Sequence, residues 1–124
     1  MDKEELGRKI SERVRNKDSE LAQKTISEII TYVSNFYSND IALEGHYEEV
    51  QISSSAYKCN LKVFDTTLEY KLDDKKISVT KEENGQVTNI DEINIDNGKT
   101  YCKHGKFSIE EIEKHLIESF KSLI

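Results

Sequence analysis

Hydrophobic and polar residues alternate along the middle of the chain. The inward positions are Tyr57, Cys59, Leu61 and Val63 in one run and Leu68, Tyr70 and Leu72 in the next. A period of two over such lengths is typical of strands with one buried face. The pattern therefore predicts an antiparallel meander of about six strands, apolar on one face and polar on the other.

Turn signals separate these predicted strands. Asn84-Gly85 and Asn97-Gly98 are dipeptides that favour two-residue hairpin turns, because both residues tolerate a positive φ. Further turns are expected at residues 54–55, 65–66 and 74–75. The expected cross-strand pairs are Ile52–Tyr57, Leu61–Tyr70, Tyr70–Val79, Val79–Ile90 and Ile95–Thr100. The alternation changes phase between Ile90 and Ile93, which indicates a bulge near residues 91–92.

Both ends of the chain have helical periodicity. One helix is predicted from Asp2 to about Arg15, followed after the polar stretch 16–19 by a second helix that Asp18 or Ser19 caps and that ends near Tyr37. A single long bent helix is the alternative that the pattern leaves open. At the other end, Ser108 and Glu111 form a predicted capping box for an amphipathic helix that reaches residue 124. Because nothing else in the chain covers the apolar face of the meander, both ends are expected to lie on it, giving a two-layer α+β single domain of residues 1–124.

Charge and composition narrow the classes of function. Asp and Glu number 24 against 18 Lys and Arg, a net charge of −6, which argues against direct binding of nucleic acid or anionic membrane. No apolar run approaches the roughly 18 residues of a membrane span, and the N-terminus lacks the apolar core of a signal peptide. Two cysteines in such a chain favour a reduced, cytoplasmic setting. A protein partner is therefore the expected ligand.

Candidate chemistry is sparse. No phosphate-binding loop, dinucleotide fingerprint, nucleophile elbow or zinc-protease motif occurs. A Cys/Cys/His/His zinc site from Cys59, Cys102, His46 and His104 lacks the close cysteine spacing of structural zinc motifs. We therefore expect two buried cysteines that act as small apolar residues, with no metal, no cofactor and no catalytic residue.

Arginine is concentrated at one place. All three arginines, Arg8, Arg13 and Arg15, fall within the first predicted helix. Guanidinium groups bind carboxylates and phosphates, so these residues, with the aromatic Tyr47 and Tyr101, are candidate contacts for a partner or a nucleotide-like ligand. The alternative is a solvated helix face with ordinary surface aromatics.

The last third resembles a known type of small protein. It runs from Asn89 through the hairpin Asp96-Asn97-Gly98-Lys99 and Tyr101-Cys102 to the closing helix. This layout is similar to that of short, uncharacterised proteins of Gram-positive bacteria that are often carried by prophages. The resemblance implies a phage or mobile-element setting, in which small acidic proteins often inhibit host machinery.

The resulting hypothesis is a small acidic non-enzymatic binding or inhibitor protein, an antagonist of host defence that occupies a protein partner. The alternative is a protein that sequesters a nucleotide or another phosphorylated metabolite, with homo-oligomers building the pocket.

Overall fold

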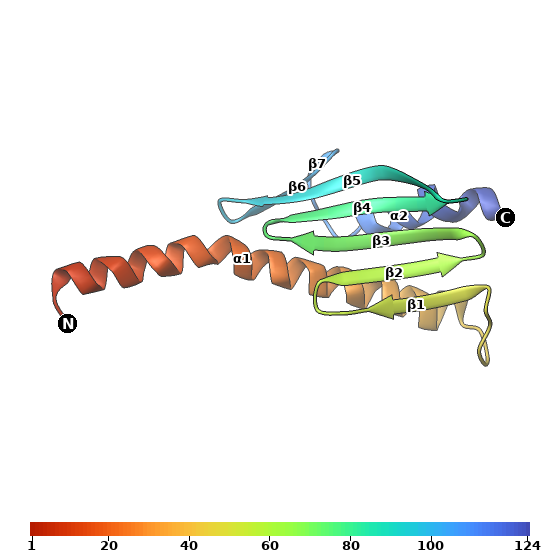
Figure 1. Ribbon diagram of the computed structural model, residues 1–124, viewed down its shortest axis with the longest axis horizontal. Coiled ribbons are helices and arrows are strands. Elements are labelled where there is room, and N and C mark those ends of the chain that lie inside the picture. The colour runs from red at the N-terminus through yellow and green to blue at the C-terminus, as the bar shows by residue number, and fades with distance from the viewer.

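One long helix and a short C-terminal helix cover one face of a seven-stranded antiparallel sheet, as the computed structural model shows for residues 1–124 (Figure 1). The elements are α1 (Lys3–Asn35), η1 (Phe36–Ile41), β1 (Val50–Ser54), β2 (Lys58–Val63), β3 (Thr66–Asp73), β4 (Lys76–Glu83), β5 (Gln86–Asp96), β6 (Lys99–Cys102), β7 (Gly105–Lys106), α2 (Glu111–Phe120) and η2 (Lys121–Leu123). The strands lie in chain order, so every connection within the sheet is a hairpin. The predicted two-layer α+β architecture is confirmed, with the short β7 as an additional strand.

The register is as predicted in the β3–β4 and β5–β6 hairpins and different in the β2–β3 hairpin. Tyr70 pairs with Val79, and Ile95 pairs with Thr100, as expected. Leu61, however, pairs with Leu68 rather than with Tyr70, because the β2–β3 turn lies at Phe64-Asp65, where Phe64 adopts a positive φ of 53°. Phenylalanine is not a typical residue of such a turn, so the sequence pattern predicted the turn one residue later, at residues 65–66.

The β1–β2 hairpin is also longer than predicted. Ile52 pairs with Leu61 rather than with Tyr57, and Tyr57 is 60% exposed in the connecting turn. Both errors displace the pairing by an even number of residues. Because side chains alternate with a period of two, such a displacement leaves the same residues on the buried face. Apart from Tyr57, which lies outside the paired strands and is exposed, the predicted inward residues therefore stay on the inward face although their predicted partners are wrong.

A β-bulge interrupts β5. Val79 pairs with Asp91 and Thr80 pairs with Asn89, so Ile90 is the extra residue. The predicted Val79–Ile90 pair is therefore wrong, although the bulge itself lies close to its predicted position. Two consecutive residues, Ile90 and Asp91, are buried there, whereas a regular strand would turn one of them outward.

The N-terminal region is one helix, which decides between the two alternatives. Asp18 does not cap a second helix; its carboxylate instead accepts hydrogen bonds from the backbone N–H groups of Asn97 (2.9 Å) and Gly98 (2.7 Å) at the β5–β6 turn. The second half of α1 packs against the sheet through Ala22, Thr25, Ile26, Ile29 and Val33. The first half projects beyond the ends of the strands, on the side of the β3–β4 and β5–β6 turns (Figure 1), and its apolar residues Leu6, Ile10 and Val14 are exposed.

The short helix α2 begins later than predicted. Its N-cap is Glu110, without a side-chain capping bond, so the predicted capping box of Ser108 and Glu111 is wrong. Phe107 and Ile112 are nevertheless both buried in the core. Glu111 does not turn back to cap the helix but enters a polar cluster between α2 and the sheet, described below. No helix in the chain is long and apolar enough to cross a membrane.

Candidate functional site

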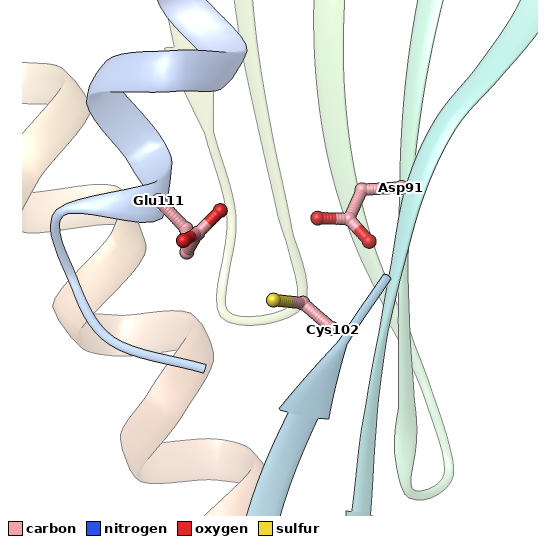
Figure 2. Close-up of side chains that lie close together, drawn as sticks. All are labelled: Asp91, Cys102 and Glu111. Atoms are coloured by element: carbon pink, nitrogen blue, oxygen red, sulfur yellow. The ribbon is translucent and has the colours of Figure 1, made fainter. Parts of the chain in front are cut away.

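Three elements bring polar side chains together beneath α2. The bulge in β5 turns Asp91 inward, β6 ends at Cys102, and the first turn of α2 supplies Glu111. Their carboxylate and thiol ligand atoms all lie within 4.8 Å of one another. Figure 2 shows the three side chains converging on one space between the helix and the strands.

A chain of buried hydrogen bonds extends from Asp91 into the core. Its Oδ2 atom lies 2.7 Å from Nε2 of His115, and Nδ1 of His115 lies 2.8 Å from the hydroxyl of Tyr70. With Asp91 ionised, Nε2 carries the proton and donates to the carboxylate, while Nδ1 accepts from the tyrosine O–H. The exposed fraction is 2% for His115 and 1% for Tyr70. The network therefore joins β3, β5 and α2 inside the hydrophobic core.

Hydrogen bonds keep Asp91 ionised despite its burial. Burial alone would raise the pKa of this carboxyl group, but the backbone N–H of Lys103, the ring of His115 and the backbone N–H of Glu92 donate to it and together lower its pKa. The two backbone bonds both reach Oδ1, at 2.9 and 2.7 Å. Burial raises the pKa of Tyr70 well above its ordinary value, so its hydroxyl stays protonated.

The carboxylate of Glu111 has a hydrogen-bond partner at only one of its two oxygens. Its Oε1 atom lies 3.0 Å from Nζ of Lys114, but its buried Oε2 atom has no hydrogen-bond partner. The neighbouring thiol of Cys102 has its pKa raised, mainly by burial, with Asp91 and Glu111 raising it further. Two carboxylates and a thiol thus share a confined space in which one carboxylate oxygen is unpaired.

An Asp–His–Tyr chain has the order of groups found in nucleophilic triads. In this protein the terminal group, Tyr70, is enclosed by core residues, so no substrate reaches its hydroxyl. A nucleophile must meet its substrate within hydrogen-bond reach of its base. The network is therefore suited to holding α2 on the sheet rather than to acyl or phosphoryl transfer.

The main open cavity lies at the other end of α2. We call it the α1–α2 groove: it has a volume of about 800 Å³, and ten of its fourteen lining residues are hydrophobic. Its apolar walls include Phe36, Ile41, Val50, Val63, Ile117 and Phe120. Grooves of this volume with predominantly apolar linings are the usual form of binding sites.

Negative charge gathers at the rim of this groove. Asp40 and Glu113 line it together with the single cation Lys121. Burial raises the pKa of Tyr32, another lining residue, and the negative charges of Glu113, Asp40 and Glu110 raise it further. The groove thus combines an apolar floor with an acidic rim.

The five residues predicted to contact a ligand are dispersed. Arg8, Arg13 and Arg15 are exposed on the projecting half of α1, and Tyr101 lies on β6. Tyr47 belongs to the segment before β1, at the opposite end of the molecule from the start of α1 (Figure 1). None of the five lines a main cavity. The nucleotide-binding alternative stays a prediction, which a thermal-shift series with nucleotides tests.

The predicted cysteine roles are half right. Cys59 is fully buried in the core, where burial raises its pKa to about 11. Cys102 is only half-buried: it packs against the core and also belongs to the polar cluster. His46 and His104 are both exposed and lie outside this cluster, so the structure does not assemble the Cys/Cys/His/His set.

The polar cluster is what reasoning from the sequence missed. His115 follows Ile112 by three residues and precedes Leu116 by one, so it lies on the apolar stripe of the C-terminal helix. A histidine on such a stripe needs a buried partner, and that requirement was a usable signal. The partner, Asp91, lies at the predicted bulge near residues 91–92, but the sequence pattern does not show that the bulge turns this carboxylate toward the helix.

Comparison of the chain with protein-family models, with curated proteins and with solved structures found no match.

Proposed function

We propose that this protein is a non-enzymatic binding protein that takes an apolar, positively charged segment of a protein partner into the α1–α2 groove. The observation that carries the proposal is the groove itself, with its apolar floor and the carboxylates of Asp40 and Glu113 at its rim. An amphipathic helix fits such a groove by placing aliphatic anchors on the floor and lysines or arginines at the rim. The net charge of −6 attracts the same kind of partner.

A pair of designed peptides tests the proposal. Both are amphipathic helices of about four turns, roughly 14 residues, with the same leucine stripe; one carries lysine and the other glutamate on its polar face. We expect the lysine peptide to bind, to shift the NMR signals of groove residues, and to bind at least tenfold more tightly than the glutamate peptide.

Ile117 gives the matched variants. This side chain lines the groove and is 52% exposed, so Ile117→Glu is expected to leave the fold intact and to weaken binding at least tenfold. Val87→Glu is the control, because Val87 is 65% exposed on β5 and does not line the groove. Equal binding by both peptides, or by the Ile117→Glu variant and the wild type, contradicts the proposal.

Self-association is a second candidate, favoured by the projecting half of α1. If two copies cross antiparallel at Ile10, each Leu6 lies beside Val14 of the other copy. The same pairing sets each Glu5 against Arg15 of the second copy, so apolar and charged positions match together. Sedimentation equilibrium tests this pairing: the wild type is expected to dimerise and Ile10→Glu to be monomeric. A monomeric wild type at millimolar concentration excludes it.

The narrower proposal is that the protein inhibits a bacterial defence system on behalf of a phage. The resemblance of its last third to prophage-borne proteins and its acidic charge support this. Expression in a Gram-positive host that restricts a phage is expected to raise the plating efficiency of that phage, and Ile117→Glu to abolish the gain. If no defended host in a panel shows a gain, this proposal fails, while binding of the lysine peptide is unaffected.

A further inference from the structure

The cluster of Asp91, Cys102 and Glu111 carries an inference that is independent of the groove. We propose that these three side chains bind one divalent cation of the zinc type, with water as the fourth ligand, and that the ion ties the end of β6 to the start of α2. The three residues come from β5, β6 and α2, so a shared ion would join elements that are distant in the sequence.

The distances suit a site close to its bound geometry. Zinc–sulfur bonds are about 2.3 Å and zinc–oxygen bonds about 2.0–2.2 Å, so neighbouring ligand atoms of a tetrahedral site lie roughly 3.5 Å apart. The ligand atoms here lie within 4.8 Å of one another. A closure of at most roughly 1.3 Å between ligand atoms, by rotation of side chains, brings them to the spacing of a tetrahedral site.

An unpaired oxygen points to a missing ligand. The Glu111 side chain is only 10% exposed, and Lys114 pairs with Oε1 alone. Oε2 is buried without a partner, and the carboxylate is directed toward Cys102 and Asp91 (Figure 2). A buried polar atom without a partner is rare in native proteins and calls for an ion or a water molecule. Oδ2 of Asp91 accepts a single hydrogen bond and so keeps a lone pair for the same ion.

The donor set selects the class of metal. A thiolate with two carboxylates suits zinc and its substitutes cobalt and cadmium, whereas magnesium and calcium prefer oxygen ligands alone. His115 would orient the Asp91 carboxylate toward the ion, because it holds Oδ2 of Asp91 through a 2.7 Å hydrogen bond. Cys102 is half-buried rather than enclosed, which leaves a path for the ion from solvent.

Cobalt(II) is the direct probe of this site. Protein treated with a chelator and then titrated with Co²⁺ is expected to bind one equivalent, with a thiolate-to-cobalt absorption band in the near ultraviolet and intense visible bands of a four-coordinate ion. One equivalent of Zn²⁺ is expected to remove these bands and to raise the melting temperature, and Mg²⁺ at millimolar concentration to do neither.

Variants assign the ligands. Cys102→Ser is expected to abolish the thiolate band, and Glu111→Gln to weaken Zn²⁺ binding at least tenfold. Glu113→Gln, an exposed acid in the same first turn of α2, is the matched control and is expected to bind like the wild type. Zn²⁺ is also expected to slow alkylation of Cys102 at least tenfold in the wild type.

Several results would overturn the site. The absence of a thiolate band in the wild type refutes it, whatever the variants do. A band that persists in Cys102→Ser assigns the ligand to Cys59, and unchanged affinity in Glu111→Gln removes the carboxylate; either result also refutes the site. Circular dichroism shows whether Cys102→Ser folds. If it does not fold, the Zn²⁺ affinity of Glu111→Gln and the effect of Zn²⁺ on the alkylation rate of the wild type decide whether the site exists.

Discussion

Removing the hydroxyl of Tyr70 tests whether the buried Asp91–His115–Tyr70 network stabilises the fold. Tyr70→Phe keeps the ring, which lies 5.6 Å from the His115 ring between centroids, and deletes only the atom that bonds Nδ1 at 2.8 Å. A buried group that loses its hydrogen-bond partner costs roughly 1–3 kcal/mol. At about 4 °C per kcal/mol for a domain of this size, the melting temperature is expected to fall by roughly 4–12 °C.

Urea unfolding followed by far-ultraviolet circular dichroism measures this cost, since the chain has no tryptophan to report by fluorescence. Tyr57→Phe is the control: Tyr57 is 60% exposed, and its variant is expected within about 0.5 kcal/mol of the wild type. In a His115→Leu background, Tyr70→Phe is expected to cost almost nothing, a coupling of about 1–3 kcal/mol. If Tyr70→Phe is as stable as the wild type, or if its cost adds to that of His115→Leu in the double variant, the hydrogen-bond network does not stabilise the fold.

Three further outcomes follow from burial and charge. Ile26→Ala is expected to cost about 2–5 kcal/mol in urea unfolding, because the side chain is fully buried, whereas Ile10→Ala, on the projecting half of α1, is expected to cost less than about 0.5 kcal/mol. Cys59, whose folded pKa is raised from 9.0 to about 11, is expected to resist alkylation at pH 8 in the native state. Its folded form keeps a proton that the unfolded form has lost, so its contribution to stability is lost as the pH rises from 9 to about 11. The pKa of Asp18 is lowered below 3.8, chiefly by the hydrogen bond from the backbone N–H of Gly98. The contribution of Asp18 to stability is therefore present above pH 3.8 and is lost as the pH falls through the lowered pKa. The Gly98 amide shift is expected to titrate below pH 3.8 in the wild type and not in Asp18→Asn.

The groove and the polar cluster show where local patterns stop being informative. Ile117 looks like an ordinary exposed helix residue, and it becomes part of a groove only because residues of η1, the end of α2 and the paired strand residues Val50 and Val63 line one cavity. Glu111 looks like half of a capping box. It enters the cluster because α2 starts at residue 111, which points the side chain toward Cys102. In both cases the function of the residue depends on its neighbours from distant parts of the chain.

The periodicities alone determined the layers of this protein. Alternation with a period of two assigns residues such as Leu61 and Tyr70 to the buried face, and any register shift by an even number of residues leaves them there. The apolar stripes of the two terminal helices then have only that face of the sheet to pack against. Tertiary structure alone decided the partners: which hairpin register formed, whether α1 continued through residue 16, and which buried polar groups met. Those outcomes rest on contacts between segments such as Asp18 with Gly98 and Asp91 with His115. Their energies depend on distances in space that no local window of the sequence contains.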